Sequence, residues 1–298
     1  MRTYNEYINE IFPGIKVQKL SIDGGFTCPN RDGTKGFDGC IYCRNDSFTP
    51  SYCDKTKSIS IQLEEGKKFF SRKYPSMKYL AYFQSYTNTH KKDIKELEKA
   101  YKEPLKYEDV VGIVIGTRPD SISEDILELL KDINQSATVF IELGAETSFD
   151  TTLSFINRNH LWKDVTDAVE KISQRNIRCG LHLIAGLPGE TDEMVLETVE
   201  KSCSLKIDSL KLHQLQILEG TALHKLWTEG KVDVRPYELD DYIKLCAEII
   251  KRVPKDMVIE RFTSQSPPGL VVAPKWDIKN YQFTNLLRNY CKSNNIEF

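Results

Sequence analysis

Three cysteines near the N-terminus are the residues of this sequence whose type and spacing best suit chemistry. Cys28, Cys40 and Cys43 lie in the run CPNRDGTKGFDGCIYC, and the last two form a CxxC pair with Tyr42 directly before the second cysteine. Three thiolates can hold three irons of a 4Fe–4S cluster and leave the fourth iron without a protein ligand. Because an open iron can bind a small molecule, such a site can be catalytic rather than only an electron carrier.

Two other interpretations of these cysteines stay open. A structural zinc site usually needs four ligands, and the nearest candidate for a fourth is Cys53, because no histidine precedes His90. Three inert thiols in a core are the other alternative, although a segment rich in Gly, Asp and Asn is typical of a loop. Four further cysteines stand alone on apolar faces and are expected in the core: Cys179, Cys203, Cys246 and Cys291.

Composition bounds the class of protein. With 298 residues, of which 40% are apolar, the chain can form one large α/β domain or two smaller ones. A net charge of −2 gives no global electrostatic argument for nucleic acid, although a local basic face is compatible with it. No apolar run approaches about 18 residues, so we expect no membrane span. The start MRTYNEYINEIFPG reads as folded protein rather than a signal peptide, and we expect a cytoplasmic protein with reduced thiols.

The chain alternates short apolar runs of strand character with longer amphipathic stretches of helix character. This order predicts a mostly parallel sheet, wound into a barrel by right-handed crossovers. A hydroxyl of Ser121 or Ser123 is expected to cap the helix over 123–134. The six predicted strands are Lys16–Asp23, Lys78–Gln84, Val110–Gly116, Thr138–Leu143, Arg178–Ala185 and Ser209–Leu218. The predicted helices between them are Ile59–Lys73, Lys91–Lys102, Ser123–Asn134, Leu161–Arg175 and Asp192–Leu205.

The expected fold is therefore an α/β barrel of six βα units over residues 1–232, followed by a small α+β extension over residues 233–298. We expect the extension to pack on the side of the barrel rather than to stand alone as a domain. Its predicted elements are the helix Leu239–Arg252, the strand Met257–Phe262, the Pro-rich turn Ser266–Gly269 and the helix Tyr281–Asn294.

Polar residues gather where the predicted strands end. Ligands of parallel α/β sheets bind at the carboxyl ends of the strands, so these residues are expected to share one polar ligand site. A buried carboxylate at Glu142 needs partners, which are either sugar hydroxyls or a neighbouring Lys or Arg. His182 is either a satisfied core histidine or a ligand contact. The full set is Gln84, Ser85, Thr87, Thr117, Glu142, Glu146 and His182.

Two further features suit a ligand that carries an adenine base and a carboxylate. The run Gly186-Leu187-Pro188-Gly189 follows the fifth predicted strand, and its glycines allow close backbone approach to a flat base. An ordinary strand-to-helix turn is the alternative. Arg158, in INRNH, offers a planar fork that matches a carboxylate, with a solvated surface arginine as the alternative.

Basic and aromatic residues interleave in several stretches that suit contacts with nucleic acid. A solvated charged face is the alternative for each of them. The stretches are SRKYPSMKY (71–79), the pair Lys91–Lys92, the pair Lys251–Arg252 and APKW (273–276).

Taken together, these motifs resemble the radical SAM superfamily, whose members use S-adenosylmethionine (SAM). Within it the chain is most similar to the YhcC/YtqA-like family, which is related to the radical domain of the Elongator catalytic subunit. The resemblance implies a six-unit partial TIM barrel. The GGE run of many members is replaced here by QSYTN, and the chain is too short for an acetyltransferase domain. The matching stretches are CPNRDGTKGFDGCIYC, YFQSYTNT, GTRPD, IELGAETSFD, INRNH, GLHLIAGLPGET, HQLQILEGT and ERFTSQSPPGLVVAPKW.

The resemblance also assigns roles by position. It places the cluster on the three cysteines, with the amino and carboxylate groups of SAM on the open iron. The YFQSYTNT loop would hold the amino end of SAM, while Glu146 and Arg158 lie where related enzymes contact the ribose and the carboxylate. His182 lies where some relatives carry an acidic contact. The residues implied in SAM binding are Tyr42, Gln84, Ser85, Thr87, Thr117, Glu142, Glu146, Arg158, His182, Gly186 and Leu187.

The implied chemistry is reductive cleavage of SAM. A reduced cluster passes one electron to the sulfonium, and the C–S bond breaks to give methionine and a 5′-deoxyadenosyl radical that abstracts hydrogen. The implied reaction converts a 5-carboxymethylaminomethyl group on tRNA wobble uridine to 5-aminomethyl. The implied partners are tRNA, an electron donor such as flavodoxin or ferredoxin, and a tRNA methyltransferase. The alternatives are a radical SAM enzyme acting on a small metabolite or a protein side chain, and a non-catalytic iron–sulfur or zinc module.

Overall fold

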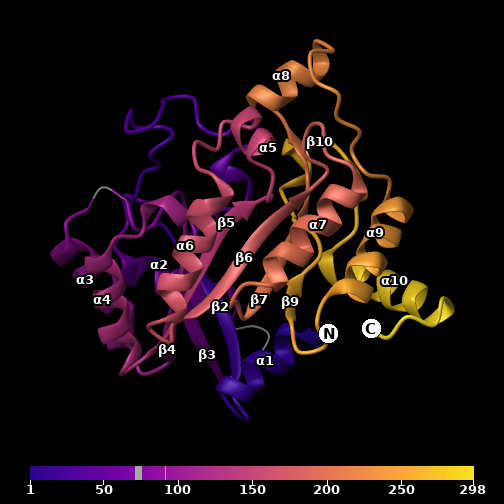
Figure 1. The fold of residues 1–298 in the computed structure, drawn as a ribbon. Helices are drawn as coiled ribbons and strands as arrows, with labels where there is room; N and C mark the ends of the chain where they lie inside the picture. The colour runs from indigo at the N-terminus through magenta and orange to yellow at the C-terminus, as the bar shows by residue number, and fades with distance from the viewer. Residues whose placement is uncertain (71–75, 91) are drawn as a thin grey trace.

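The structure is a computed structural model that describes residues 1–70, 76–90 and 92–298. Its centre is an eight-stranded parallel sheet that curls into a half barrel, with the order β1-β9-β7-β6-β5-β4-β3-β2 (Figure 1). The edge beyond β7 is completed by β9 (Val258–Arg261) and β1 (Arg2–Thr3). The other six strands follow the chain in order across the sheet: β2 (Lys16–Ile22), β3 (Met77–Phe83), β4 (Val110–Thr117), β5 (Thr138–Glu146), β6 (Arg178–Ala185) and β7 (Ser209–Gln214).

Helices connect the strands and pack along the sheet (Figure 1). In the described parts of the chain, no helix has the length and apolar character needed to cross a membrane. The helices are α1 (Tyr4–Ile11), α2 (Ile59–Phe70), α3 (Ile94–Lys102), α4 (Glu124–Asn134), α5 (Asp150–Phe155), α6 (Trp162–Ser173), α7 (Asp192–Cys203), α8 (Ala222–Thr228), α9 (Leu239–Arg252) and α10 (Asn280–Ser293).

Local apolar patterns and a capping residue explain the central strand β4 and the helix α4. β4 reads VVGIVIGT and is buried along most of its length, as expected for a parallel strand covered on both faces. The hydroxyl of Ser123 accepts a hydrogen bond from the amide of Ile126 and caps α4. The predicted cap is therefore Ser123, while Ser121 ends the preceding 3₁₀ turn. The buried faces of strands and helices join in one large apolar core.

The predicted sixth strand divides into two. β7 ends at Gln214, and the next residues form β8 (Ile217–Leu218), which pairs antiparallel with β10 (Val271–Ala273). The partner of β8 lies more than fifty positions further along the chain. A continuous apolar run therefore could not reveal the break.

Several short elements were not predicted, among them α1, α5 and α8. The start of α1 carries a signal that was overlooked, because Thr3 and Glu6 form a capping box. The predicted end of the second helix at Lys73 and the predicted start of the next helix at Lys91 lie outside the described residues.

The C-terminal extension shares the sheet with the barrel. β9 pairs parallel with β7, with Ile259 opposite Leu210, and α9 packs against both α7 and α10. The division of the chain at residue 232 stays a prediction, but the sheet itself runs across that position.

An aromatic cluster joins the elements of the extension to one another. The rings of Trp276 and Phe283 stack at 5.9 Å between centroids, and Tyr242 lies 5.5 Å from Phe283. The indole nitrogen of Trp276 donates to the Tyr237 carbonyl at 2.9 Å. Trp276, which belongs to the candidate nucleic-acid contact APKW, is therefore half-buried and already stacked on another ring of the protein.

Substitution of Phe283 by alanine is expected to lower the unfolding free energy of the whole protein by about 3–5 kcal/mol, because the ring is fully buried. Since the extension shares the sheet, loss of the cluster should shift one cooperative transition. Tyr281→Ala, on the exposed side of the same helix, is the matched control and should change stability little. Urea unfolding followed by circular dichroism measures both, and a separate early transition in Phe283→Ala would contradict the prediction.

Candidate active site

A cavity of about 700 Å³ lies at the carboxyl ends of the central strands. That volume is within the range of roughly 300–1,000 Å³ seen for small-molecule and cofactor sites. The strands deliver polar side chains to it, and the loop after β2 covers one side with cysteines. The predicted site residues that line it are Cys28, Cys40, Tyr42, Cys43, Gln84, Thr87, Thr117, Glu142, Glu146, Arg158 and His182.

Three predicted residues do not line this cavity: Ser85, Gly186 and Leu187. Ser85 is buried, and Leu187 packs in the apolar cluster around β8. Gly186 has a φ of +86°, and a Cβ added there would lie 2.9 Å from the Tyr237 ring. The glycine is thus required by backbone conformation and packing, whether or not a base stacks on it.

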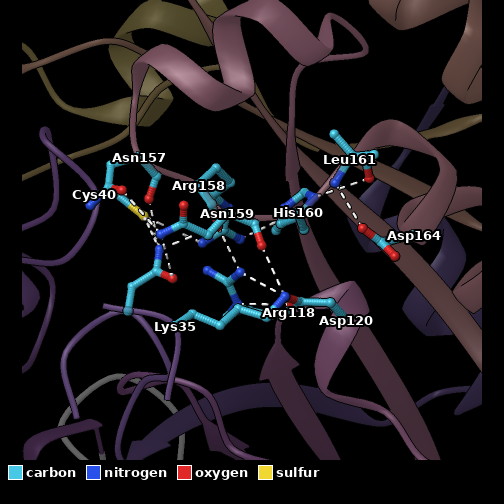
Figure 2. A network of polar contacts seen from close by, with 12 residues as sticks. Lys35, Cys40, Arg118, Asp120, Asn157, Arg158, Asn159, His160, Leu161 and Asp164 are labelled. Carbon is cyan, nitrogen blue, oxygen red and sulfur yellow. Dashed lines mark hydrogen bonds and ion pairs between the residues drawn. The ribbon is translucent and has the colours of Figure 1, made fainter. Parts of the chain in front are cut away.

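The cysteine loop (residues 28–43) is held by the INRNH segment (residues 156–160) that follows α5, as Figure 2 shows. The amide nitrogen of Asn30 donates to the Asn157 carbonyl at 2.7 Å, and that of Asn157 donates to the Gly39 carbonyl at 2.6 Å. Asn157 and Asn159 both have positive φ, a conformation that asparagine tolerates better than most residues. These contacts fix the loop that carries Cys40.

A buried ion network supports the INRNH segment from below. Arg118 forms two hydrogen bonds at 2.9 Å to Asp120 and donates to the Arg158 carbonyl at 2.7 Å (Figure 2). Lys35, from the cysteine loop, contacts the same Asp120 at 2.5 Å and the Asn159 carbonyl at 2.9 Å. Burial alone would raise the pKa of Asp120, but Arg118 and Lys35 hold it well below its usual range. The network therefore stays charged at neutral pH.

Arg158 lies beside the cysteines and is paired with Glu146. The guanidinium contacts the Glu146 carboxylate at 3.1 Å, the Gly144 carbonyl at 2.6 Å and the Cys40 sulfur at 3.7 Å. A Cβ at Gly144 would lie 2.4 Å from this guanidinium, so glycine leaves the space that Arg158 fills. Glu146 has a φ of +66°, an uncommon conformation that aims its carboxylate at Arg158.

The cysteines suit a cluster better than an exposed redox pair. Burial, with Cys40 as a further cause, raises the pKa of Cys43 to about 11, so this thiol needs a cation to become a thiolate. Among the described residues, no group of three or more His, Cys, Asp and Glu is gathered as the ligands of one metal ion would be. Cluster thiolates bind different irons and do not have to converge on one point. The donor set of three sulfurs on one cavity wall fits a 4Fe–4S cluster.

Cys53, the candidate fourth ligand of the zinc alternative, does not line the cavity. Its thiol donates to the Ser21 carbonyl at 2.9 Å, and burial raises its pKa to about 12. Cys179, Cys246 and Cys291 are buried as predicted, while Cys203 is half-buried.

A closed ring of charges forms another part of the cavity wall. The carboxylate of Glu142 contacts Lys19 at 2.5 Å and Lys211 at 2.6 Å, and Glu260 contacts the same two lysines at 2.8 and 2.9 Å. Tyr82 donates to Glu142 at 2.7 Å. Burial alone would raise the pKa of Glu142, but Lys19, Lys211 and His182 hold it well below its usual range. The sequence left two kinds of partner open for Glu142, sugar hydroxyls or a neighbouring Lys or Arg. The structure provides lysine partners.

Two histidines stack next to this ring. His182 Nε2 lies 2.7 Å from the Glu142 carboxylate, and its ring lies 5.5 Å from that of His213. His213 Nε2 is 2.9 Å from the guanidinium of Arg261 and accepts a hydrogen bond from it. Burial lowers the pKa of both histidines, with Lys211 a further cause for His182 and Arg261 for His213. Both rings are therefore neutral at physiological pH.

Five residues of this charged region were missed from the sequence. For Lys211 and His213 a signal was present, because these two residues alternate with leucines in LKLHQ. Side chains alternate between the two faces of a strand, so such positions point away from the outer core. The missed residues are Lys19, Lys211, His213, Glu260 and Arg261.

Comparison with known proteins agrees with this geometry. The family model of the radical SAM superfamily matches residues 27–201, and that of the radical SAM C-terminal domain matches residues 207–293. The chain belongs to the radical SAM superfamily. Members of that superfamily bind a 4Fe–4S cluster and SAM, and the chain is a radical SAM enzyme.

Relatives place the chain within this superfamily. Protein YtqA of Bacillus subtilis is 34% identical over 280 residues, which cover 94% of this chain and 86% of that protein. Protein YhcC of Escherichia coli is 36% identical over 264 residues, 88% of this chain and 83% of that protein. A tRNA uridine(34) acetyltransferase of Methanocaldococcus jannaschii is 26% identical over 213 residues, 69% of this chain and 37% of that protein.

The fold is also that of a solved relative. The structure of Elp3 from Methanocaldococcus infernus superposes with a TM-score of 0.69 at 19% identity, covering 95% of this chain and 64% of that chain. The expected partial barrel of the radical SAM superfamily is thereby confirmed, with two further strands in the same sheet.

His160, at the end of the INRNH segment, gives the site a measurable pH dependence. Burial, with nearby Arg158 as a further cause, lowers its pKa to about 3. In the unfolded chain this histidine takes up a proton near pH 6.5, whereas in the folded protein it stays neutral down to about pH 3. Acid therefore favours the unfolded state, and stability is lost as the pH falls from about 6.5 toward 3. Between about pH 7.5 and 5, the unfolding free energy of His160→Asn should fall by about 2 kcal/mol less than that of the wild type. Urea unfolding at each pH measures this, and parallel losses would contradict it.

Proposed function

We propose that this radical SAM enzyme converts a 5-carboxymethylaminomethyl group on the wobble uridine of tRNA to a 5-aminomethyl group. SAM would be the two-electron oxidant and end as methionine and 5′-deoxyadenosine, water would be the co-reactant, and the two carbons of the carboxymethyl group would leave as glyoxylate. Cys28, Cys40 and Cys43 would hold the cluster. The observation that carries the proposal is the single cavity that joins these cysteines to a wall of buried charges. Support for tRNA comes from relatives named as tRNA uridine(34) acetyltransferases. The alignment with the one from Methanocaldococcus jannaschii covers 69% of this chain.

The residues around the cysteines would bind and orient the cofactors. When bound, the cluster and SAM supply an electron and a carbon radical that removes hydrogen from an unactivated carbon. The Arg158–Glu146 pair offers a cation for the SAM carboxylate and an acceptor for a ribose hydroxyl, and Arg158 contacts Cys40. Gln84 and Thr87 enter the same cavity after β3. The remaining SAM contacts predicted from the sequence stay predictions: Tyr42, Ser85, Thr117, Glu142, His182, Gly186 and Leu187.

The barrel would exclude water from the reacting carbon and hold the substrate next to SAM. The ring of Lys19, Lys211, Glu142 and Glu260 is suited to this role, because its four side chains satisfy one another and keep a fixed shape. Substrate groups would then meet an ordered polar wall rather than mobile solvated charges.

Some of the residues proposed to contact tRNA already bind other groups of the protein. Lys92 donates to the Gly24 carbonyl at 3.0 Å and lies over the Phe26 ring, so it serves the fold. Arg252 contacts Glu193 at 3.3 Å on the exposed surface. The first five residues of SRKYPSMKY and Lys91 lie outside the described residues. An electron donor such as flavodoxin or ferredoxin and a tRNA methyltransferase complete the proposed set of partners.

The radical chemistry is tested on protein purified without oxygen and reconstituted with iron and sulfide. With dithionite and SAM, the wild type is expected to form 5′-deoxyadenosine, and Cys40→Ala is expected to form none above background, because one iron loses its ligand. Cys203→Ala, on α7 and away from the cavity, is the matched control and should retain activity. Liquid chromatography of the nucleosides provides the readout.

The substrate is tested by adding tRNA that carries 5-carboxymethylaminomethyluridine to the same reaction. Mass spectrometry of the digested tRNA should show 5-aminomethyluridine with the wild type and none with Cys40→Ala. Wild-type enzyme that forms 5′-deoxyadenosine but leaves this tRNA unchanged would refute the proposed substrate and retain the enzyme class.

A further inference from the structure

Arg261 carries a positive charge into the cavity that no carboxylate neutralises among the residues that the structure describes. It ends β9 and lines the cavity wall. Its guanidinium contacts His213 Nε2 at 2.9 Å, and its Nε atom is buried without a hydrogen-bond partner. A neutral imidazole does not balance the charge, so the guanidinium retains both charge and an unused donor.

The neighbouring acids are already engaged. The carboxylates of Glu142 and Glu260 are shared by two lysines, each at 2.5 to 2.9 Å. Further round the wall, Glu146 pairs with Arg158. Two lysines therefore match two glutamates, and the ring is neutral as a whole. Arg261 adds one positive charge to this part of the cavity.

An uncompensated cation in a partly buried site is costly unless a ligand supplies the counter-charge. Arginine presents a planar fork of donors, which matches the two oxygens of a carboxylate. The chemistry that fits the Arg261 site is therefore a carboxylate that enters the cavity.

We propose that Arg261 binds the carboxylate of the substrate's 5-carboxymethylaminomethyl group. The inference rests on the proposed function and names the residue that selects its substrate. The product, a 5-aminomethyl group, has lost that carboxylate and keeps a protonated amine. Arg261 would attract the substrate and repel the product, so the same charge serves both recognition and release.

SAM carries a carboxylate as well, and the test separates the two sources. Arg261→Gln removes the charge and keeps polar volume, while Arg261→Lys keeps the charge without the fork. Arg288→Gln, on the exposed side of α10, is the matched control for the substitution. Iron content and thermal unfolding of each reconstituted protein show that it is folded and loaded.

Arg261→Gln is expected to lower kcat/KM for the modified tRNA about tenfold to a hundredfold, the size of a lost hydrogen bond to a charged group. The loss should fall mainly on KM, while the dissociation constant of SAM stays within about twofold. Arg261→Lys should recover part of the loss, because it keeps the charge. Lower SAM affinity with unchanged tRNA kinetics at saturating SAM would overturn the proposal and assign the site to SAM. Unchanged values for both ligands would also overturn it.

A binding measurement separates this inference from the proposed reaction. Isothermal titration of the SAM-loaded enzyme with free 5-carboxymethylaminomethyluridine should show binding that weakens at least about tenfold in Arg261→Gln. Free 5-aminomethyluridine should bind weakly to both proteins. Arg261-dependent binding without conversion of tRNA would support the carboxylate site and refute the reaction. Conversion of tRNA with equal kinetics in Arg261→Gln would support the reaction and refute the site.

Discussion

The cost of placing charge inside a barrel is the constraint on which this site depends. Arg118 and Asp120 are almost fully buried, and the ring of lysines and glutamates lies within the cavity wall. Each ion is held because an opposite charge lies within hydrogen-bonding distance, which offsets the loss of water. Removing one partner would leave a buried charge unpaired. The pairing therefore fixes which side chains form the wall.

The same constraint attaches the cysteine loop to the fold. The loop has little apolar content, so it cannot be fixed by a hydrophobic core of its own. Lys35 instead joins the buried Arg118–Asp120 pair, and Asn30 binds the INRNH backbone. The loop is thus anchored by polar contacts that end at Cys40. Arg158 joins the buried ion pair to the cysteine loop, since its carbonyl accepts a hydrogen bond from Arg118 and its guanidinium contacts Cys40.

The C-terminal extension contributes to this arrangement as well as to stability. β9 continues the sheet past β7 and brings Glu260 and Arg261 to the cavity. A partial barrel that ended at β7 would lack one acid of the charged ring. The extension is held in place by the pairing of β9 with β7 and by the packing of α9 on α7, so contacts outside the cavity determine which charges enter it.

The sequence by itself determined the order of six strands and most helix positions, because local patterns of apolar residues specify them. It also determined the cysteine triplet, because the spacing of the cysteines is visible in the sequence. It also indicated that polar residues at strand ends share one cavity. Only the tertiary structure decided which charges meet, since Lys19 and Glu260 form an ion pair across 241 positions of the chain. It also decided that Trp276 packs half-buried against Phe283 and that β8 leaves the sheet. Such pairings depend on long-range contacts, which no local pattern specifies.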